Sequence, residues 1–149
     1  MGDSSLHKEI DLIQNCINRM ANNSFILKGW VVSILAVVLS LAINKFNSLF
    51  LLCSVLIPLF CFWWLDAFFL RKENMYRKMY EWVLIERKNG NLDFQYDLNP
   101  NRFKKEVPSF CEVMFSKTLF VFYGVPFIIF LFIALFDVKD VFCGYICGC

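Results

Sequence analysis

The sequence predicts an all-α integral membrane protein with three transmembrane helices, and three observations lead to this fold class. Hydrophobic residues make up 58% of the 149 residues and charged residues only 19%, a balance that excludes an ordinary soluble domain. Three apolar runs, residues 25–44, 49–70 and 119–136, are long enough to cross about 30 Å of hydrocarbon as helices, the third only just. All the lysines and arginines except Lys45 and Lys139 lie on one side of these runs.

This charge distribution fixes the expected orientation and the division of the chain. The N-terminus and the connection between the second and third runs carry the positive charge, so both are predicted to be cytosolic. The short connection at 44–48 forces the first two spans into an antiparallel hairpin. We expect a cytosolic amphipathic helix over 1–24, a transmembrane hairpin over 25–70, a cytosolic helix and extended segment over 71–117, a third transmembrane helix over 118–136, and an outer cysteine-containing tail over 137–149.

The first of these regions carries a narrow apolar seam. Its apolar residues are spaced alternately four and three apart, as on a helix that pairs with another helix. Three arrangements satisfy this pattern: a helix lying on the membrane surface, packing against the cytosolic helix of the same chain, or pairing with another subunit as an oligomerisation seam. The seam consists of Leu6, Ile10, Ile13, Ile17 and Met20.

The second span is predicted to continue as a helix into the cytosol. No helix breaker occurs before Asn89-Gly90, so a helix from residue 49 to Lys88 would be about 60 Å long, with Gly90 as its C-cap. Residues 91–99 alternate apolar and polar side chains, which predicts an extended segment packed on that helix, and Pro108 fits the first turn of the helix that follows. A basic face could meet lipid head groups, an acidic partner or a nucleotide; it consists of Arg71, Lys72, Arg77 and Lys78.

Asp66 is a single carboxylate near the cytosolic end of the second span. At 1.5 Å per residue it lies about 27 Å along its helix from Ser48, and Lys28 lies about 24 Å along the first span from Asn44. In an antiparallel hairpin the two charges therefore reach similar depths, and an intramembrane ion pair is expected because an unpaired carboxylate there would be costly. Asp66 then staples the hairpin, lines a water-filled cytosolic mouth, or is an exposed interfacial residue. An interfacial aromatic belt is expected at this depth, formed by Trp30, Trp63 and Trp64.

Helix-breaking residues occur in two of the spans. Pro58 lies in the second, and Pro126 with Gly124 lies in the third. Each proline frees a carbonyl and usually kinks the helix, which is either an ordinary feature of a span or a means of flaring or gating a bundle. Apart from Ser33, Ser40, Ser54 and Tyr123 the spans are apolar, so a constitutive wide aqueous pore is not expected and any conduction would require rearrangement or a hydrophobic gate.

Residues for catalysis or cofactor binding are not found. His7 is the only histidine, and the sequence has no phosphate-binding glycine loop, nucleophile elbow or suitably spaced acid pair, so no enzyme, cofactor, metal or direct nucleic-acid binding is expected. The chain ends in FCGYICGC, on the outer side in this topology, where an oxidising compartment permits disulfides. One could form among Cys143, Cys147 and Cys149, within the tail or between subunits.

Two stretches together resemble a known family. QNCINRMANNSFILKGW at 14–30 and WWLDAFFLRKENMYR at 63–77 are similar to small bacterial inner-membrane proteins that occur as membrane accessory components beside antiphage defence systems, a likeness that covers about the first hundred residues. The resemblance implies a multi-pass protein of the inner membrane that assembles with further copies and permeabilises or depolarises the bilayer. The alternative is a membrane anchor or sensor that recruits a cytosolic defence protein.

Overall fold

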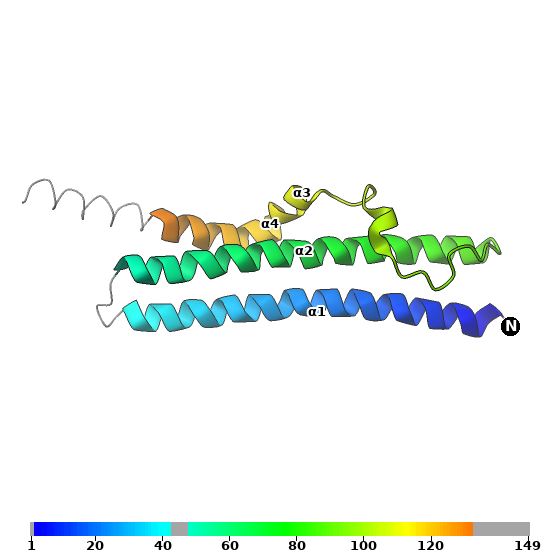
Figure 1. Ribbon diagram of the computed structural model, residues 1–149, viewed down its shortest axis with the longest axis horizontal. Coiled ribbons are helices and arrows are strands. Elements are labelled where there is room, and N and C mark those ends of the chain that lie inside the picture. Colours follow the sequence, from blue (N-terminus) through cyan, green and yellow to red (C-terminus); the bar gives the residue numbers. More distant parts are fainter. Residues whose placement is uncertain (1, 43–47, 133–149) are drawn as a thin grey trace, which may run out of the picture.

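The computed structural model describes residues 2–42 and 48–132, and this part of the chain is helical and contains no strand. Two long helices, α1 (Gly2–Ala42) and α2 (Ser48–Lys88), run antiparallel and side by side (Figure 1). The remaining described residues pack mainly on α2, which is therefore the central element. The predicted all-α class is confirmed. The outer tail, with Cys143, Cys147 and Cys149, lies outside the described residues.

Both long helices could cross a membrane. The stretches Ser4–Val38 and Cys53–Lys88 are long and apolar enough to do so, whereas the apolar helix Lys117–Phe132 is shorter within the described part of the chain. The boundary expected near residue 24 does not interrupt α1, which continues from the amphipathic region into the apolar region as one helix. Its internal glycine, Gly29, has open space around its Cα and requires no break.

The end of α2 follows from local backbone chemistry. Gly90 takes a left-handed φ of 78°, and the Asn91 amide donates to the Glu86 carbonyl at 3.0 Å, which closes the last turn. The predicted helix end at Lys88 and the glycine cap are confirmed. Pro58 lies inside α2, and the helix continues on both sides of it.

The prediction of an extended segment after α2 is wrong. Residues 93–96 form turns, in which Phe94 and Tyr96 adopt left-handed φ values of 55° and 61°. A lone strand has no neighbour to bond its backbone. Here side-chain oxygens take that role instead, since Asn91, Asp97 and Asn99 each accept from the amide two residues further along. A short 3₁₀ helix, η1 (Pro100–Phe103), follows.

The chain returns along α2 as a broken helix. α3 (Phe110–Met114) begins at Ser109, where a capping box pairs Ser109 with Glu112, so Pro108 precedes the helix rather than entering it. The Ser109 amide and then its hydroxyl hold the pKa of the exposed Glu112 carboxyl below its ordinary value. The cap contributes to the stability of the fold at pH values above the pKa that Glu112 has in the unfolded chain. This stability is lost as the pH falls through the lowered pKa of Glu112 in the folded chain.

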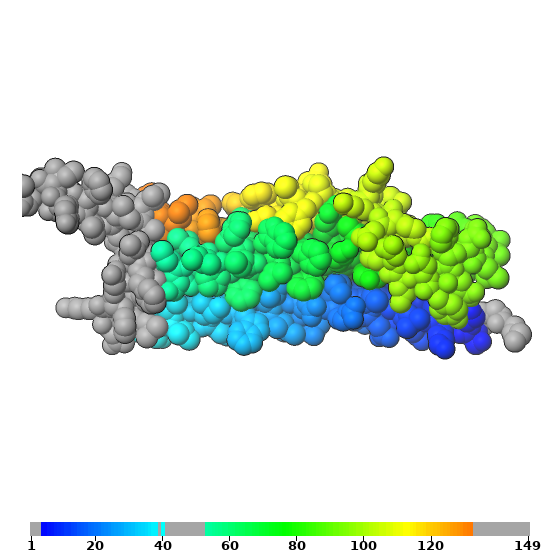
Figure 2. All heavy atoms as spheres, viewed as in Figure 1, coloured from blue at the N-terminus to red at the C-terminus, as the bar shows by residue number. Residues whose placement is uncertain are grey.

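The last described elements, here called the third segment, cover residues 117–132. They comprise α4 (Lys117–Leu119), a π-helical turn η2 (Phe120–Gly124) and a helix that continues to Phe132. The third segment therefore begins at the predicted place but carries an irregular turn. Figure 2 shows it packed along the apolar half of α2.

Two separate cores hold the helices together. The span core joins α1, α2, α3 and the third segment; it consists of Val31, Leu59, Trp63, Ala67, Val113, Met114, Leu119 and Tyr123. The stalk core joins the N-terminal half of α1 to the C-terminal half of α2 and η1; it consists of Ile13, Met79, Val83 and Phe103. Beside the stalk core, burial raises the pKa of the Tyr76 phenol, which also contacts the half-buried Cys16.

The core corrects the expected aromatic belt. Trp63 is buried, and its indole Nε1 donates to the Met114 carbonyl at 2.9 Å, whereas Trp30 and Trp64 are exposed. Trp63 therefore fastens α3 to α2 and does not mark an interface with lipid, because its ring points into the helix junction and not outward.

The apolar seam of α1 is used inside the chain. Ile13 is 1% exposed in the stalk core, and Leu6 and Ile17 pack against the same core. Ile10 and Met20 are half-buried. Of the arrangements open from the sequence, packing on the C-terminal half of α2 in the same chain is the one observed. The use of the seam for oligomerisation stays a prediction, in which Ile13 has no part because its side chain is buried within the chain.

Replacing Ile13 should test this intramolecular seam. Ile13→Ala leaves a cavity in the stalk core and is expected to cost about 2 to 5 kcal/mol of unfolding free energy. Leu12→Ala is the matched control, because the Leu12 side chain is 37% exposed and its truncation should change the unfolding free energy little. Thermal melting of the detergent-solubilised chain measures both. Equal losses for the two variants would contradict the assigned packing.

Candidate functional site

Asp66 lies at the point where α1, α2 and the third segment meet. Its residue is fully buried, at 0% exposure, and its neighbours Trp63 and Ala67 belong to the span core. Trp63, Ala67 and Asp66 share one face of α2, because residues three and four apart are neighbours on a helix. The same face therefore carries the apolar contacts and the single acidic group.

Two residues of α1 satisfy this carboxylate. The Lys28 Nζ donates to Asp66 Oδ2 at 2.6 Å, and the Ser24 hydroxyl donates to Oδ1. Lys28 Nζ also donates to Ser24 Oγ at 2.7 Å, which closes a three-membered polar network. Ser24 and Lys28 are one helical turn apart, so both reach the carboxylate from one face of α1. The two charges that the sequence predicts to meet do form an ion pair; Ser24 is an addition that sequence reasoning missed.

The polar network is closed at Asp66 and partly open at Lys28. Asp66 has no exposed side-chain surface, while the Lys28 side chain keeps 25% of its surface exposed. A buried ion pair needs further hydrogen bonds to offset the loss of hydration, and Ser24 supplies one to each partner. This arrangement matches the stapling role expected for Asp66 and leaves no opening to water at the carboxylate itself.

The π-helical turn places a second polar group beside the network. Tyr123 is fully buried, and its phenol lies close enough to Asp66 to interact with the carboxylate. Gly124 permits the turn, since a Cβ there would lie 2.8 Å from the Phe120 ring. π-helical turns occur frequently at functional sites. Gly124 is thus tied to a local distortion of the third segment, which Pro126 follows two residues later.

A second polar cluster fastens the N-terminal end of α1 to the C-terminal end of α2; these two ends are here called the stalk. Arg87 Nε and Nη2 donate to the two oxygens of Glu9 at 2.9 and 3.0 Å, and both side chains are buried. Glu9 also accepts from the Tyr96 amide at 3.1 Å, and Arg87 donates to the Asn91 and Asp93 carbonyls. Charge-assisted bidentate pairs are the strong class of ion pair. Sequence reasoning missed Glu9, although its position one turn before Ile13 places it beside the seam.

The predicted basic face does not form a continuous free surface. Arg71 and Lys72 donate to the Pro108 carbonyl and the Asn101 side chain, so they hold the returning chain against α2. Arg77 pairs with the buried Glu73 at 2.7 Å, and Lys78 pairs with Glu81 at 2.7 Å. All four cations therefore have partners within the chain.

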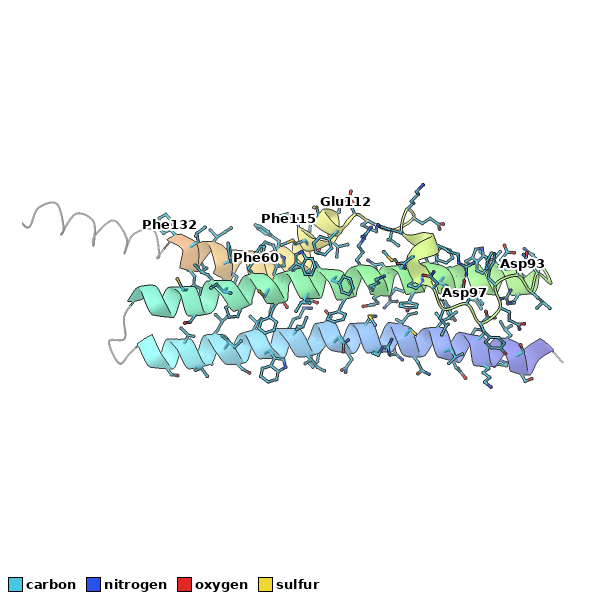
Figure 3. The ribbon with its side chains drawn as sticks, viewed as in Figure 1. Phe60, Asp93, Asp97, Glu112, Phe115 and Phe132 are labelled. Atoms are coloured by element: carbon cyan, nitrogen blue, oxygen red, sulfur yellow. The ribbon has the colours of Figure 1, made fainter. Side chains whose placement is uncertain are left out.

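Figure 3 shows the acidic side chains Asp93 and Asp97 at the stalk end and Phe60 and Phe132 toward the opposite end.

Other features of the described residues give no site of their own. His7 is exposed, and no group of histidine, cysteine or acidic side chains within residues 2–42 and 48–132 is arranged to hold a metal. Comparison with protein-family models, with curated proteins and with solved structures finds no match.

Removing one charge of the Asp66 network should be more harmful than removing both. Lys28→Met leaves a buried carboxylate without its cation, and a loss of about 3 to 5 kcal/mol in unfolding free energy is expected. The double change Lys28→Met with Asp66→Leu should recover most of this loss. Denaturation of the four-member mutant cycle in detergent measures the coupling. Strictly additive losses would contradict the ion pair.

Loss of the Glu9 charge should free the stalk tip. Glu9→Gln removes the negative charge and one of the two acceptor oxygens that Arg87 uses. The bidentate pair is lost and the support of the Tyr96 amide weakens, so hydrogen exchange at residues 91–97 is expected to speed up by about tenfold or more. Asp11 lies two residues after Glu9 on α1. Asp11→Asn, at an exposed position, is the control. Unchanged exchange in Glu9→Gln would show that the turns hold without the cluster.

Proposed function

We propose that this chain is a three-span protein of the bacterial inner membrane that acts in antiphage defence, as an oligomeric effector that perturbs or permeabilises the membrane. The observation that carries the proposal is the buried network of Asp66, Lys28 and Ser24 at the junction of three apolar helices. The link to defence comes from the resemblance of residues 14–30 and 63–77 to defence-associated membrane proteins.

The topology assigns one crossing to each apolar region. α1 and α2 are each long enough to cross, and the third segment packs on the apolar part of α2 at the level of Leu59 and Trp63. The apolar sequence continues from Phe132 to Phe136, which completes a third crossing in this proposal. The excess of lysine and arginine places the N-terminus and the stalk in the cytosol.

The buried network favours an effector over a passive anchor. A span that only anchors a protein is stabilised by apolar packing, and replacing a buried ion pair by apolar residues is often neutral or stabilising. Ionisable groups inside membrane helices usually serve function. The π-helical turn of the third segment lies at the same junction, beside the buried Tyr123, and such turns are frequent at functional sites.

Oligomerisation in this proposal uses the exposed apolar surface of the spans, since Ile13 of the α1 seam is already buried in a single copy. Large apolar side chains are exposed along the spans, and these face lipid in a single copy or a neighbouring subunit in an assembly. A single copy encloses no polar channel in its described part, so conduction requires several copies and a change in their packing. The exposed apolar side chains include Phe25, Trp30, Val32, Ile57 and Val121.

A second candidate is a membrane anchor or sensor that recruits a cytosolic partner. The stalk favours it, because the Glu9–Arg87 cluster fixes a tip on which Leu92 and Phe94 are 64% and 59% exposed. Exposed apolar groups on a rigid support are typical of a binding surface.

The membrane potential of cells decides between the two candidates. The chain is expressed with and without phage, as wild type, as the Lys28→Met/Asp66→Leu double variant, and as Asp93→Asn, a control at an exposed aspartate. If the chain is an effector, the wild type and the Asp93→Asn control both depolarise cells. The double variant, which lacks the network, should depolarise a fraction of cells at least about tenfold smaller at equal membrane abundance. An unchanged potential in every case, with phage present, contradicts the effector and favours the anchor.

A further inference from the structure

A groove opens between α1 and the third segment, next to the Asp66 network. Its volume is about 580 Å³, and it is lined by Lys28, Lys117, Thr118, Val121 and Phe122. The two lysines come from different elements, one from α1 and one from the first turn of the third segment. The groove is thus lined by two cations, one threonine and two apolar side chains.

Both lysines retain the capacity to bind an anion. An ammonium has three protons to donate, and Lys28 uses two bonds, to Asp66 and to Ser24, while its side chain stays 25% exposed. Lys117 is exposed, and its side chain makes no hydrogen bond or ion pair within the described part of the chain. An anion at Lys28 therefore does not require the Asp66 pair to break.

The chain itself does not supply this anion inside the membrane. Asp66 is the only acidic residue from 24 to 70, and it is buried, while residues 113–136 contain none. A second copy packed through its spans would thus offer no free carboxylate to the two lysines. A soluble anion would leave Val121, which is 65% exposed, and Phe122 without an apolar partner. A molecule with one anionic end and one apolar end complements the whole groove.

We propose that this groove binds one anionic phospholipid. The phosphate lies between Lys28 and Lys117, with the Thr118 hydroxyl as a further donor, and an acyl chain runs along Val121 and Phe122. The lipid then links α1 to the third segment, which otherwise meet only around the span core. The site depends on both elements lying in the bilayer, and it does not depend on the chain perturbing that bilayer.

Lipid selectivity of the full chain in vesicles tests the site. Spin-labelled phosphatidylglycerol and phosphatidylcholine are compared in phosphatidylcholine vesicles, and the motionally restricted fraction of each label gives their relative affinity. Wild type should prefer phosphatidylglycerol, and Lys117→Gln should weaken that preference by about fivefold, the effect expected of one lysine at a membrane surface. Lys105→Gln, which removes an exposed charge from the cytosolic connection, should leave it unchanged. Lys28 itself is left intact because the Asp66 network needs it.

Further measurements distinguish a bound phospholipid from a soluble anion and from a second copy of the chain. Inorganic phosphate at millimolar concentration should not displace the labelled lipid, and Val121→Ser should lower affinity for both lipids by shortening the apolar wall. Equal selectivity in wild type, Lys117→Gln and Lys105→Gln overturns the proposal. Displacement by inorganic phosphate overturns it in favour of a soluble anion. A loss of self-association in Lys117→Gln without a change in lipid selectivity overturns it in favour of a second copy.

Discussion

A carboxylate without exposure to water dictates how the apolar half of this protein is arranged. Asp66 must have donors on both oxygens, and only α1 provides them, through Ser24 and Lys28. This requirement sets the register of α1 against α2, since a slip of one residue would turn both donors away. Apolar packing alone tolerates such slips more readily, because hydrophobic contact is not directional. The network therefore specifies the hairpin as much as it stabilises it.

A second cluster of buried charges also satisfies its groups across α1 and α2. Glu9 and Arg87 form a buried bidentate pair, and their spare bonds hold the turns at 91–96 against α1. The two charged clusters lie near the opposite ends of a stretch of α1 that has its apolar seam between them. The third segment joins this frame through Leu119 and Tyr123, which are buried in the span core, and η2 interrupts its regular helix. The protein is therefore built as a two-helix frame with a third, irregular element packed on it.

Much of this frame could be predicted from the sequence, for physical reasons that act locally. The length of α2, its end at Gly90 and the pairing of Lys28 with Asp66 follow from breaker residues, helical rise and antiparallel depth. The burial of Trp63 could not be predicted, because an indole near the expected membrane boundary can face either lipid or a protein core. The position of α3 decides which of these Trp63 faces. The turns at Phe94 and Tyr96 could not be predicted either. Alternation favours a strand, but the acceptors that replace a neighbouring strand are side-chain oxygens of Asn91, Asp97 and Glu9. The sequence also could not show whether the α1 seam packs against its own chain or another copy, because that depends on the tertiary fold.

The most direct test of the account is a measurement of the Asp66–Lys28 contact in a bilayer. Solid-state NMR on the chain in lipid vesicles, with ¹³C in the aspartate carboxyls and ¹⁵N in the lysine side chains, reports dipolar coupling between the two groups. A strong carboxyl–ammonium coupling that disappears in Asp66→Asn, and not in Asp93→Asn, is the result predicted by the 2.6 Å contact. A spectrum without any coupling that depends on Asp66 would contradict the network and, with it, the arrangement of the three apolar helices around it.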